Sequence, residues 1–241
     1  MIALTEKASL SCQKLGLSKD KIWRRPNPID DQKFKIEEGV KKDLRNSLTP
    51  FSEDQIVISN VAKIMPQKNQ FLILEVLTYL PDQYVAVIAG PFIKEGSLYQ
   101  RDKEYLDRMQ AYIKDQNLQS RVCLITDFVD AEKYMKLSDI YAMPAYNEGF
   151  GTPMMEAMGC GLPVIANKDE TAFQEWIIDG INGYLCDIKH PELWAQAVEK
   201  ASKFSKEQCL DISENIRKKA GQEAIYGEYM AIITKLLQGG K

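Results

Sequence analysis

Histidine and closely spaced cysteines are scarce in this sequence. Its 241 residues include a single histidine, His190, and five cysteines, no two of which have Cys-x-x-Cys spacing. Zinc sites need clustered ligands, histidine-based triads need a positioned histidine, and disulfide scaffolds need a paired set of cysteines. We therefore expect none of these three kinds of site. The cysteines are interpreted as small buried residues in a reducing cytosol.

An excess of basic charge is also missing. Lys and Arg number 31 against 34 Asp and Glu, a net charge of −3, which argues against a general binder of nucleic acid or membrane surfaces. No apolar run approaches the ~18 residues that a membrane span needs. Glu6 and Lys7 lie where a signal peptide would have its apolar core, so we expect a cytoplasmic protein without one.

Short apolar runs alternate with segments of helical pattern along most of the chain. We expect a short helix over 5–15 ended by Gly16, a turn-rich connector over 21–30 and a charged helix over 33–46. Strands are then expected over 56–61, 84–90, 121–126, 139–144, 163–166 and 183–186, with helices over 71–80, 102–116, 131–137, 152–159 and 173–179. This alternation predicts an α/β fold, a doubly wound and mostly parallel sheet of Rossmann type.

Three further helices are expected to close the chain. The first covers 193–203. The second opens with the capping box from Ser205 to Gln208. The third covers 222–237 and should stop at Gly239-Gly240.

Two loops that follow expected strands carry the residues best suited to chemistry, because ligands of doubly wound sheets bind at the carboxyl ends of strands. The loop after strand 56–61 contains Lys63 and Lys68, with Lys68 directly before an expected helix. A helix N-terminus offers free N–H groups, so a lysine there favours an anion site. The alternative is two solvated lysines on a turn.

The loop after strand 139–144 contains glycines and two acids. Gly149 and Gly151 allow close approach of a ligand or a positive φ, and Thr152 followed by Pro153 predicts the N-cap and first position of a helix. The N–H groups of this turn suit a diphosphate. Glu148, in the loop, and Glu156, expected in the first helical turn, could bind sugar hydroxyls, so the combination indicates a sugar nucleotide. Separately, each residue could be ordinary turn chemistry or helix-dipole compensation.

Glu148 and Glu156, with seven residues between them, resemble the E-x7-E motif of family-4-type retaining glycosyltransferases, which have the GT-B fold. The surrounding sequence, YNEGFGTP followed by EAMGCGLPVIA, is similar to the family signature over its whole length. Lys63 and Lys68 resemble the family's phosphate-binding Arg…Lys pair, although lysine at position 63 lacks the bidentate geometry of arginine.

Further segments extend this resemblance to nearly the whole chain. Residues 27–30 resemble the Asn-Gly-Val-Asp that joins the two GT-B domains, with Pro28 replacing glycine, and residues 175–183 resemble the glutamate-then-glycine stretch beyond the motif. The resemblance covers only half of the family's usual protein. It implies that residues 1–30 are a remnant of an N-terminal acceptor domain with the interdomain linker, and that 31–241 form a donor-binding domain with C-terminal helices. A naturally split enzyme is the alternative to a fragment.

The resemblance also implies roles for individual residues. Lys63 and Lys68 would hold the donor diphosphate and stabilise leaving-group charge, in place of a metal ion or other cofactor. Glu156 would bind ribose hydroxyls and Glu148 the donor sugar. The backbone at Gly149, Phe150, Gly151 and Thr152 would contact sugar and phosphates, Val129 would lie near the base, and Gly90 would border the donor.

The implied activity is transfer of a sugar, with retained configuration, from a UDP- or GDP-sugar to a hydroxyl of an acceptor saccharide or lipid-linked glycan in polysaccharide or glycoconjugate synthesis. The missing N-terminal domain would complete the cleft and could bring the protein to the inner face of the membrane. A non-catalytic nucleotide-sugar-binding module, or the partner subunit of a split transferase, is the alternative. A GT-B epimerase or phosphorylase fits less well, because His190 precedes a C-terminal helix and the cleft offers few other titratable groups.

Overall fold

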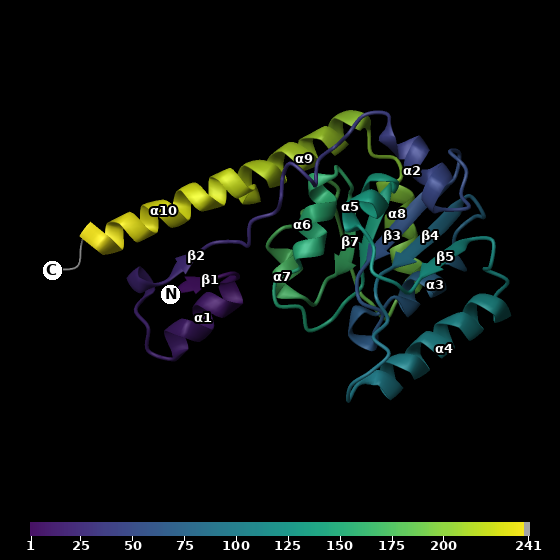
Figure 1. Cartoon of the computed structure of the whole chain (residues 1–241), viewed down its shortest axis with the longest axis horizontal. Coiled ribbons are helices and arrows are strands. Elements are labelled where there is room, and N and C mark those ends of the chain that lie inside the picture. The colour runs from purple at the N-terminus through teal and green to yellow at the C-terminus, as the bar shows by residue number, and fades with distance from the viewer. Residues whose placement is uncertain (239–241) are drawn as a thin grey trace.

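A parallel sheet forms the centre of the computed structural model, which describes residues 1–238 (Figure 1). Within those residues the main sheet contains six strands in the order β5-β4-β3-β6-β7-β8, and every neighbouring pair is parallel. The strands are β3 (Ile56–Val61), β4 (Tyr84–Ala89), β5 (Val122–Ile125), β6 (Ile140–Met143), β7 (Val164–Asn167) and β8 (Gly183–Cys186). Helices cover both faces, so the prediction of a doubly wound parallel sheet is confirmed.

The strands have continuous apolar sequences because both faces of the sheet are covered. All six residues of β4 are buried, as expected for a central parallel strand. One hydrophobic cluster joins the sheet to α3 (Phe71–Leu77), α4 (Tyr99–Asp115) and α8 (Pro191–Ala201). Another joins it to α5 (Ala131–Lys136), α6 (Thr152–Gly159) and α9 (Lys206–Ala220). These two layers hold the carboxyl ends of the strands at one edge.

The N-terminal residues form a small unit apart from this sheet. Strands β1 (Ile2–Ala3) and β2 (Trp23–Arg24) pair in parallel, and α1 (Glu6–Lys14) packs beside them, with the side chain of Thr5 accepting a hydrogen bond from Ala8 N. A one-turn 3-10 helix, η1 (Lys19–Lys21), connects α1 to β2. In Figure 1 this unit lies beneath α10 (Gln222–Gln238).

Four expected helices differ from the structure by three or more residues. Helix α3 ends at Leu77 instead of 80, and α4 begins at Tyr99 instead of 102. The segment expected as a helix over 33–46 is irregular up to Gly39. This residue has a φ of +85° and is the N-cap of α2 (Val40–Leu48), so the helix begins later than expected. The helix expected over 173–179 is only α7 (Thr171–Gln174). There Asn182 Oδ1 accepts a hydrogen bond from Ile178 N and its amide donates to Trp176 O, which ends the helix early.

The closing helices match expectation more closely. Ser205 and Gln208 form the predicted reciprocal capping box, and His190 is the N-cap of α8. The predicted stop at Gly239-Gly240 lies outside the described residues.

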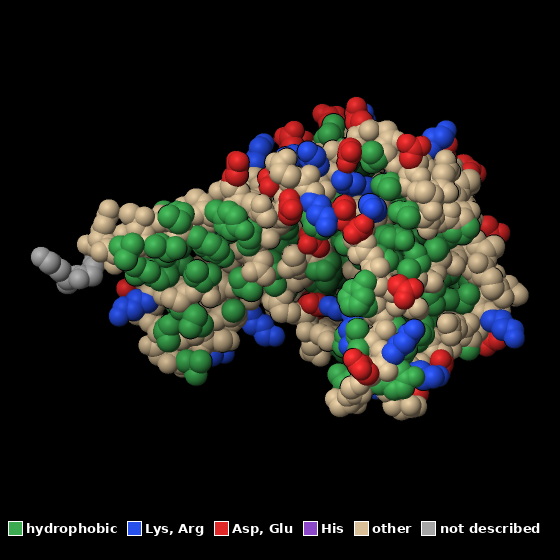
Figure 2. All heavy atoms as spheres, in the orientation of Figure 1, with side chains coloured by type: hydrophobic (Ala, Val, Ile, Leu, Met, Phe, Trp, Pro, Cys, Tyr) green, Lys and Arg blue, Asp and Glu red, His purple; other side chains and the backbone are tan. Residues whose placement is uncertain are grey.

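Helix α10 extends away from the sheet and carries an exposed apolar face, seen as green side chains in Figure 2. Tyr226, Met230, Ile233 and Leu237 are each at least 47% exposed on it. Among the helices of residues 1–238, none combines the length and the apolarity that crossing a bilayer requires.

Candidate functional site

The strand order reverses between β3 and β6. From β3 the chain builds β4 and β5 to one side, and it then returns to place β6, β7 and β8 on the other. In open parallel sheets such a switch point leaves a crevice at the carboxyl ends of the two strands, where ligands bind. The loops that leave these two strands are 62–70 and 144–151, the two loops chosen from the sequence. The fold therefore brings together residues that are about eighty positions apart.

The two loops are fastened to each other by hydrogen bonds. Tyr146 N donates to Gln67 O at 3.1 Å, and the Gln67 side-chain amide donates to Asn147 O at 3.0 Å. The side-chain amide of Asn69 lies 3.4 Å from Pro144 O. These contacts place Lys68 directly beside the glycine-rich turn.

Lys68 and Glu148 form an ion pair between the two loops. Their side chains are 20% and 11% exposed, so the pair is shielded from bulk solvent yet can still be reached by a ligand. Lys68 and Glu148, which were selected from two separate loops of the sequence, are therefore in contact in the structure.

Glu170 holds the loop that carries Glu148, although nothing in the sequence points to this role. Its carboxylate accepts hydrogen bonds from Asn147 N at 2.6 Å and Glu148 N at 3.1 Å. Asn147 has a φ of +58°, a conformation that asparagine tolerates better than most residues. Glu170 is also the residue before α7, a position that suggests helix capping and conceals its contact with the distant loop.

Lys68 does not lie at an open helix N-terminus as expected. It ends the one-turn 3-10 helix η2 (Pro66–Lys68), and α3 begins three residues later. The first amide of α3, Phe71 N, already donates to the Tyr105 hydroxyl at 2.8 Å. An anion beside Lys68 would therefore be bound by the ammonium group and not by this helix end.

Lys63 contacts a different acid. Its ammonium lies 3.3 Å from Asp102 Oδ2, and the Asp102 side chain is only 1% exposed. The other oxygen of Asp102 is held by Arg101. The two predicted phosphate-binding lysines thus lie in the same loop but in separate ion pairs.

The start of α6 differs by one residue from the prediction. Gly151, with a φ of +85°, is the N-cap, and Thr152 is the first helical residue, so Thr152 does not cap the helix with its side chain. A Cβ atom on Gly151 would lie 2.8 Å from Cε1 of Phe173, whereas a Cβ atom on Gly149 would meet nothing within 4 Å. Phe150 is buried against Trp176, so only its backbone is placed to face a ligand.

Glu156 lies in the second turn of α6, one turn later than expected. Burial raises the pKa of its carboxyl group, Lys33 opposes that rise, and Glu132 adds to it. Within residues 1–238 the carboxylate makes no ion pair and accepts no side-chain hydrogen bond. A half-buried acid in that condition has free acceptor oxygens for the hydroxyls of a ligand.

Tyr141 lies in β6 near both acids of the E-x7-E pair. Burial raises the pKa of its hydroxyl, which donates to Val61 O at 3.2 Å, and Glu156 and Glu148 raise that pKa further. The ionised carboxylates of Glu156 and Glu148 thus both disfavour ionisation of this buried hydroxyl.

Gly90 and Val129 follow β4 and β5 at the same edge of the sheet. Gly90 has a φ of +148°, and a Cβ atom there would lie 2.1 Å from Ala62 O, so the loop after β3 can pass closely only over a glycine. Val129 is half-buried against the core, whereas Phe128 is 83% exposed. Both predicted residues border the edge that carries Lys63 and Lys68.

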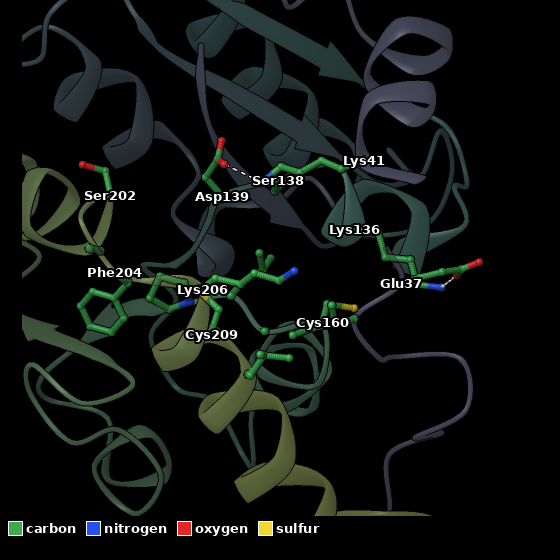
Figure 3. A pocket seen from close by; sticks show the side chains of 16 residues that line it. Glu37, Lys41, Lys136, Ser138, Asp139, Cys160, Ser202, Phe204, Lys206 and Cys209 are labelled. Atoms are coloured by element: carbon green, nitrogen blue, oxygen red, sulfur yellow. Dashed lines mark hydrogen bonds and ion pairs between the residues drawn. The ribbon is translucent and has the colours of Figure 1, made fainter. Parts of the chain in front are cut away.

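A cavity of about 360 Å³ lies at the opposite edge, before β6 and β7 begin (Figure 3). Three lysines line it, and each is paired with an acid: Lys41 with Asp139, Lys136 with Glu37, and Lys206 with Glu38. These pairs leave little free charge for a ligand. Among the described residues no group of three His, Cys, Asp or Glu side chains could hold a metal ion.

The fold is an α/β domain in which the loops after β3 and β6 meet at the switch point of a parallel sheet. The sequence model of the glycosyl transferases group 1 matches residues 41–219. The chain belongs to this family, and its sheet and helices match those of GT-B glycosyltransferases.

Curated relatives include two kinds of sugar transferase. The UDP-Gal:alpha-D-GlcNAc-diphosphoundecaprenol alpha-1,3-galactosyltransferase of Escherichia coli is 28% identical over 193 residues, 77% of this chain and 43% of the relative. The D-inositol 3-phosphate glycosyltransferase of Paenarthrobacter aurescens (strain TC1) is 34% identical over 93 residues, 38% of this chain and 22% of the relative. The chain thus spans less than half the length of these relatives.

Solved structures with the same fold include Anabaena Alr3699/HepE in complex with UDP and glucose, with a TM-score of 0.82 at 20% identity. The match covers 98% of this chain and 63% of the Anabaena chain. Sucrose-phosphate synthase from Thermosynechococcus elongatus has a TM-score of 0.81 at 20% identity, over 99% of this chain and 58% of the other.

Proposed function

We propose that this chain is the donor-binding half of a family-4-type retaining glycosyltransferase. It would bind a nucleotide sugar, such as a UDP- or GDP-sugar, from which the sugar is transferred to an acceptor hydroxyl. The observation that carries the proposal is the meeting of Lys68 and Glu148 at the switch point of the sheet, with the unpaired Glu156 on the adjoining helix. A ligand that contains both phosphate and sugar hydroxyls would use the cationic and the acceptor groups together.

Each part of the donor has a partner in this arrangement. Lys68 and Lys63 hold the diphosphate and offset the charge that develops on the leaving group. Glu156 accepts hydrogen bonds from ribose hydroxyls, and Glu148 contacts the donor sugar. The backbone from Gly149 to Thr152 approaches the sugar and phosphates. With two ammonium groups beside the diphosphate, the reaction proceeds without a metal ion.

The acceptor is bound by a further domain, which in a complete transferase closes the other side of the crevice. Residues 1–30 belong to that domain and to the linker, and residues 31–241 form the donor-binding domain. Synthesis of a polysaccharide or glycoconjugate is the process that we assign, in line with the E. coli relative's activity on a lipid-linked sugar.

The test is the affinity of the full chain for UDP, GDP and their sugar derivatives, measured by titration calorimetry with EDTA present. We expect one series to bind, and Lys68→Ala to weaken the diphosphate by about 10- to 150-fold, the equivalent of a charge-assisted hydrogen bond worth about 1.5–3 kcal/mol. The free nucleoside should change by less than about twofold, because it has no phosphate to lose.

Lys206→Ala is the matched control, since this exposed lysine pairs with Glu38 away from the crevice. It should leave every affinity unchanged. Absence of nucleotide binding, binding that requires a divalent ion, or an equal loss of nucleoside and diphosphate in Lys68→Ala would each contradict the proposal.

A further inference from the structure

A buried carboxylate holds two cations at the same edge of the sheet. Asp102 lies in the first turn of α4, beyond the carboxyl end of β4. Its Oδ2 lies 3.3 Å from Lys63 Nζ, and its Oδ1 accepts hydrogen bonds from Arg101 Nη2 at 2.6 Å and from Arg101 Nε at 3.0 Å. One acid therefore joins the loop after β3 to the start of α4.

The backbone of Lys63 is held as well. The side-chain amide of Gln70 donates to Lys63 O at 2.9 Å, and Gln70 is fully buried. With its carbonyl oxygen and its ammonium both held, Lys63 has a defined position before any ligand arrives. Groups positioned in advance lose less conformational entropy on binding.

The charges of this cluster do not cancel. One carboxylate faces two cations, which leaves a net charge of about +1 beside the crevice. Asp102 is 1% exposed and cannot contact a ligand, whereas Lys63 and Arg101 are 33% and 47% exposed. The guanidinium binds Asp102 through Nε and Nη2, so Nη1 remains available as a donor. Within residues 1–238, no acceptor contacts Nη1.

We propose that Asp102 is a positioning residue that holds Lys63 and Arg101 as a two-cation clamp for the donor diphosphate. Arg101 would contribute the planar guanidinium that suits phosphate oxygens, beside the point charge of Lys63. This inference rests on the proposed function, because it assigns a further phosphate-binding residue to the same site. With Lys68, three cations then surround the diphosphate.

If Asp102 only compensates the helix dipole, neutralising it should have the opposite effect on phosphate binding. An acid in the first turn of a helix compensates the helix dipole, and it would merely reduce the positive charge of its neighbours. In that case Asp102→Asn raises the local charge to about +2 and tightens phosphate binding. If Asp102 positions the cations, the same substitution weakens it.

The experiment compares affinities of the full chain for UDP, UMP and uridine, or for the guanine series if that binds more tightly. We expect Arg101→Ala to weaken the diphosphate about 3- to 10-fold, with less than a twofold change for the nucleoside, and Arg101→Lys to restore part of the loss. Lys103→Ala is the matched control, because this neighbouring residue pairs with Asp107 on the exposed face of α4. It should have no effect.

We expect Asp102→Asn to weaken diphosphate binding by more than threefold while the nucleoside affinity stays unchanged. Tighter or unchanged diphosphate binding by Asp102→Asn would overturn the proposal. Diphosphate binding by Arg101→Ala that equals that of the wild type would also overturn it. If Asp102→Asn does not fold, the two Arg101 variants decide the matter alone. Loss of binding in Lys68→Ala with wild-type behaviour of the Arg101 variants refutes this inference and leaves the proposed function standing, whereas a wild-type chain that binds no nucleotide refutes both.

Discussion

The ion pair between Lys68 and Glu148 should compete with binding of the donor diphosphate. Glu148 pairs with the ammonium group that the diphosphate would need. Glu148→Gln keeps the shape of the side chain and removes its charge, so Lys68 becomes free for phosphate. We therefore expect this variant to bind UDP more tightly than the wild type.

The expected gain follows from the burial of the pair. Exposed ion pairs contribute about 0–1 kcal/mol, and removing one partner of a fully buried pair costs about 3–5 kcal/mol. With side chains 20% and 11% exposed, a value near 1 kcal/mol is appropriate, which corresponds to about fivefold tighter binding of UDP. A sugar nucleotide also loses its contact with the carboxylate, worth about 1.5–3 kcal/mol, so its affinity should fall about 2- to 30-fold.

The assay is titration calorimetry with UDP and with the sugar nucleotide that the wild-type chain binds best, at low and at high salt. The two ligands should respond to Glu148→Gln in opposite directions, and the gain for UDP should shrink at high salt because the interaction is screened. If both ligands change in the same direction, or if UDP binds less tightly, then Glu148 does not compete for Lys68 and contact the sugar as proposed.

Two further substitutions test the rest of the site. Because burial raises the pKa of Glu156, folding favours its protonated form, and this contribution is complete below the unfolded-state pKa and is lost as pH rises through the raised value. Glu156→Gln should therefore melt at a higher temperature than the wild type at pH 7, with the difference vanishing below about pH 4, and bind nucleoside about tenfold more weakly; a lower melting temperature or unchanged affinity would contradict this account. Gly90→Ala should reduce the free energy of unfolding by about 2–4 kcal/mol in urea, since its Cβ atom would lie 2.1 Å from Ala62 O at a φ of +148°. Gly149→Ala, with nothing within 4 Å of its Cβ atom, should cost less than about 1 kcal/mol, and equal effects of the two alanines would show the steric argument to be wrong.

Most of the sheet could be predicted because buried parallel strands have continuous apolar sequences. The bounds of β3, β8 and α6 agree with those expected, and the other strands of the main sheet differ by one residue at one or both ends. Two of the failures among the helices have local causes that composition does not show. The amide of Asn182 and the left-handed Gly39 ended or delayed helices that composition alone favoured.

The site was predictable in its parts and not in its contacts. Glycines, lysines and acids that follow strands can be recognised in sequence, because the carboxyl ends of strands are where ligands bind. Glu170, Asp102 and Arg101 could not be chosen in that way. Glu170 and Asp102 each contact a loop that is separate in the chain, and Arg101 is linked to that loop only through its neighbour Asp102. In the sequence Asp102 resembles any acid in the first turn of a helix.

The order of residues by itself determined which segments are strands and which loops carry charge. Burial of both faces of a strand and the geometry of a turn each constrain the residue types within that segment. Only the tertiary structure decided that β3 lies next to β6, and this adjacency brings Lys68 to Glu148 across about eighty residues. Strand order depends on how helices pack over both faces of the sheet, and no single segment encodes that packing.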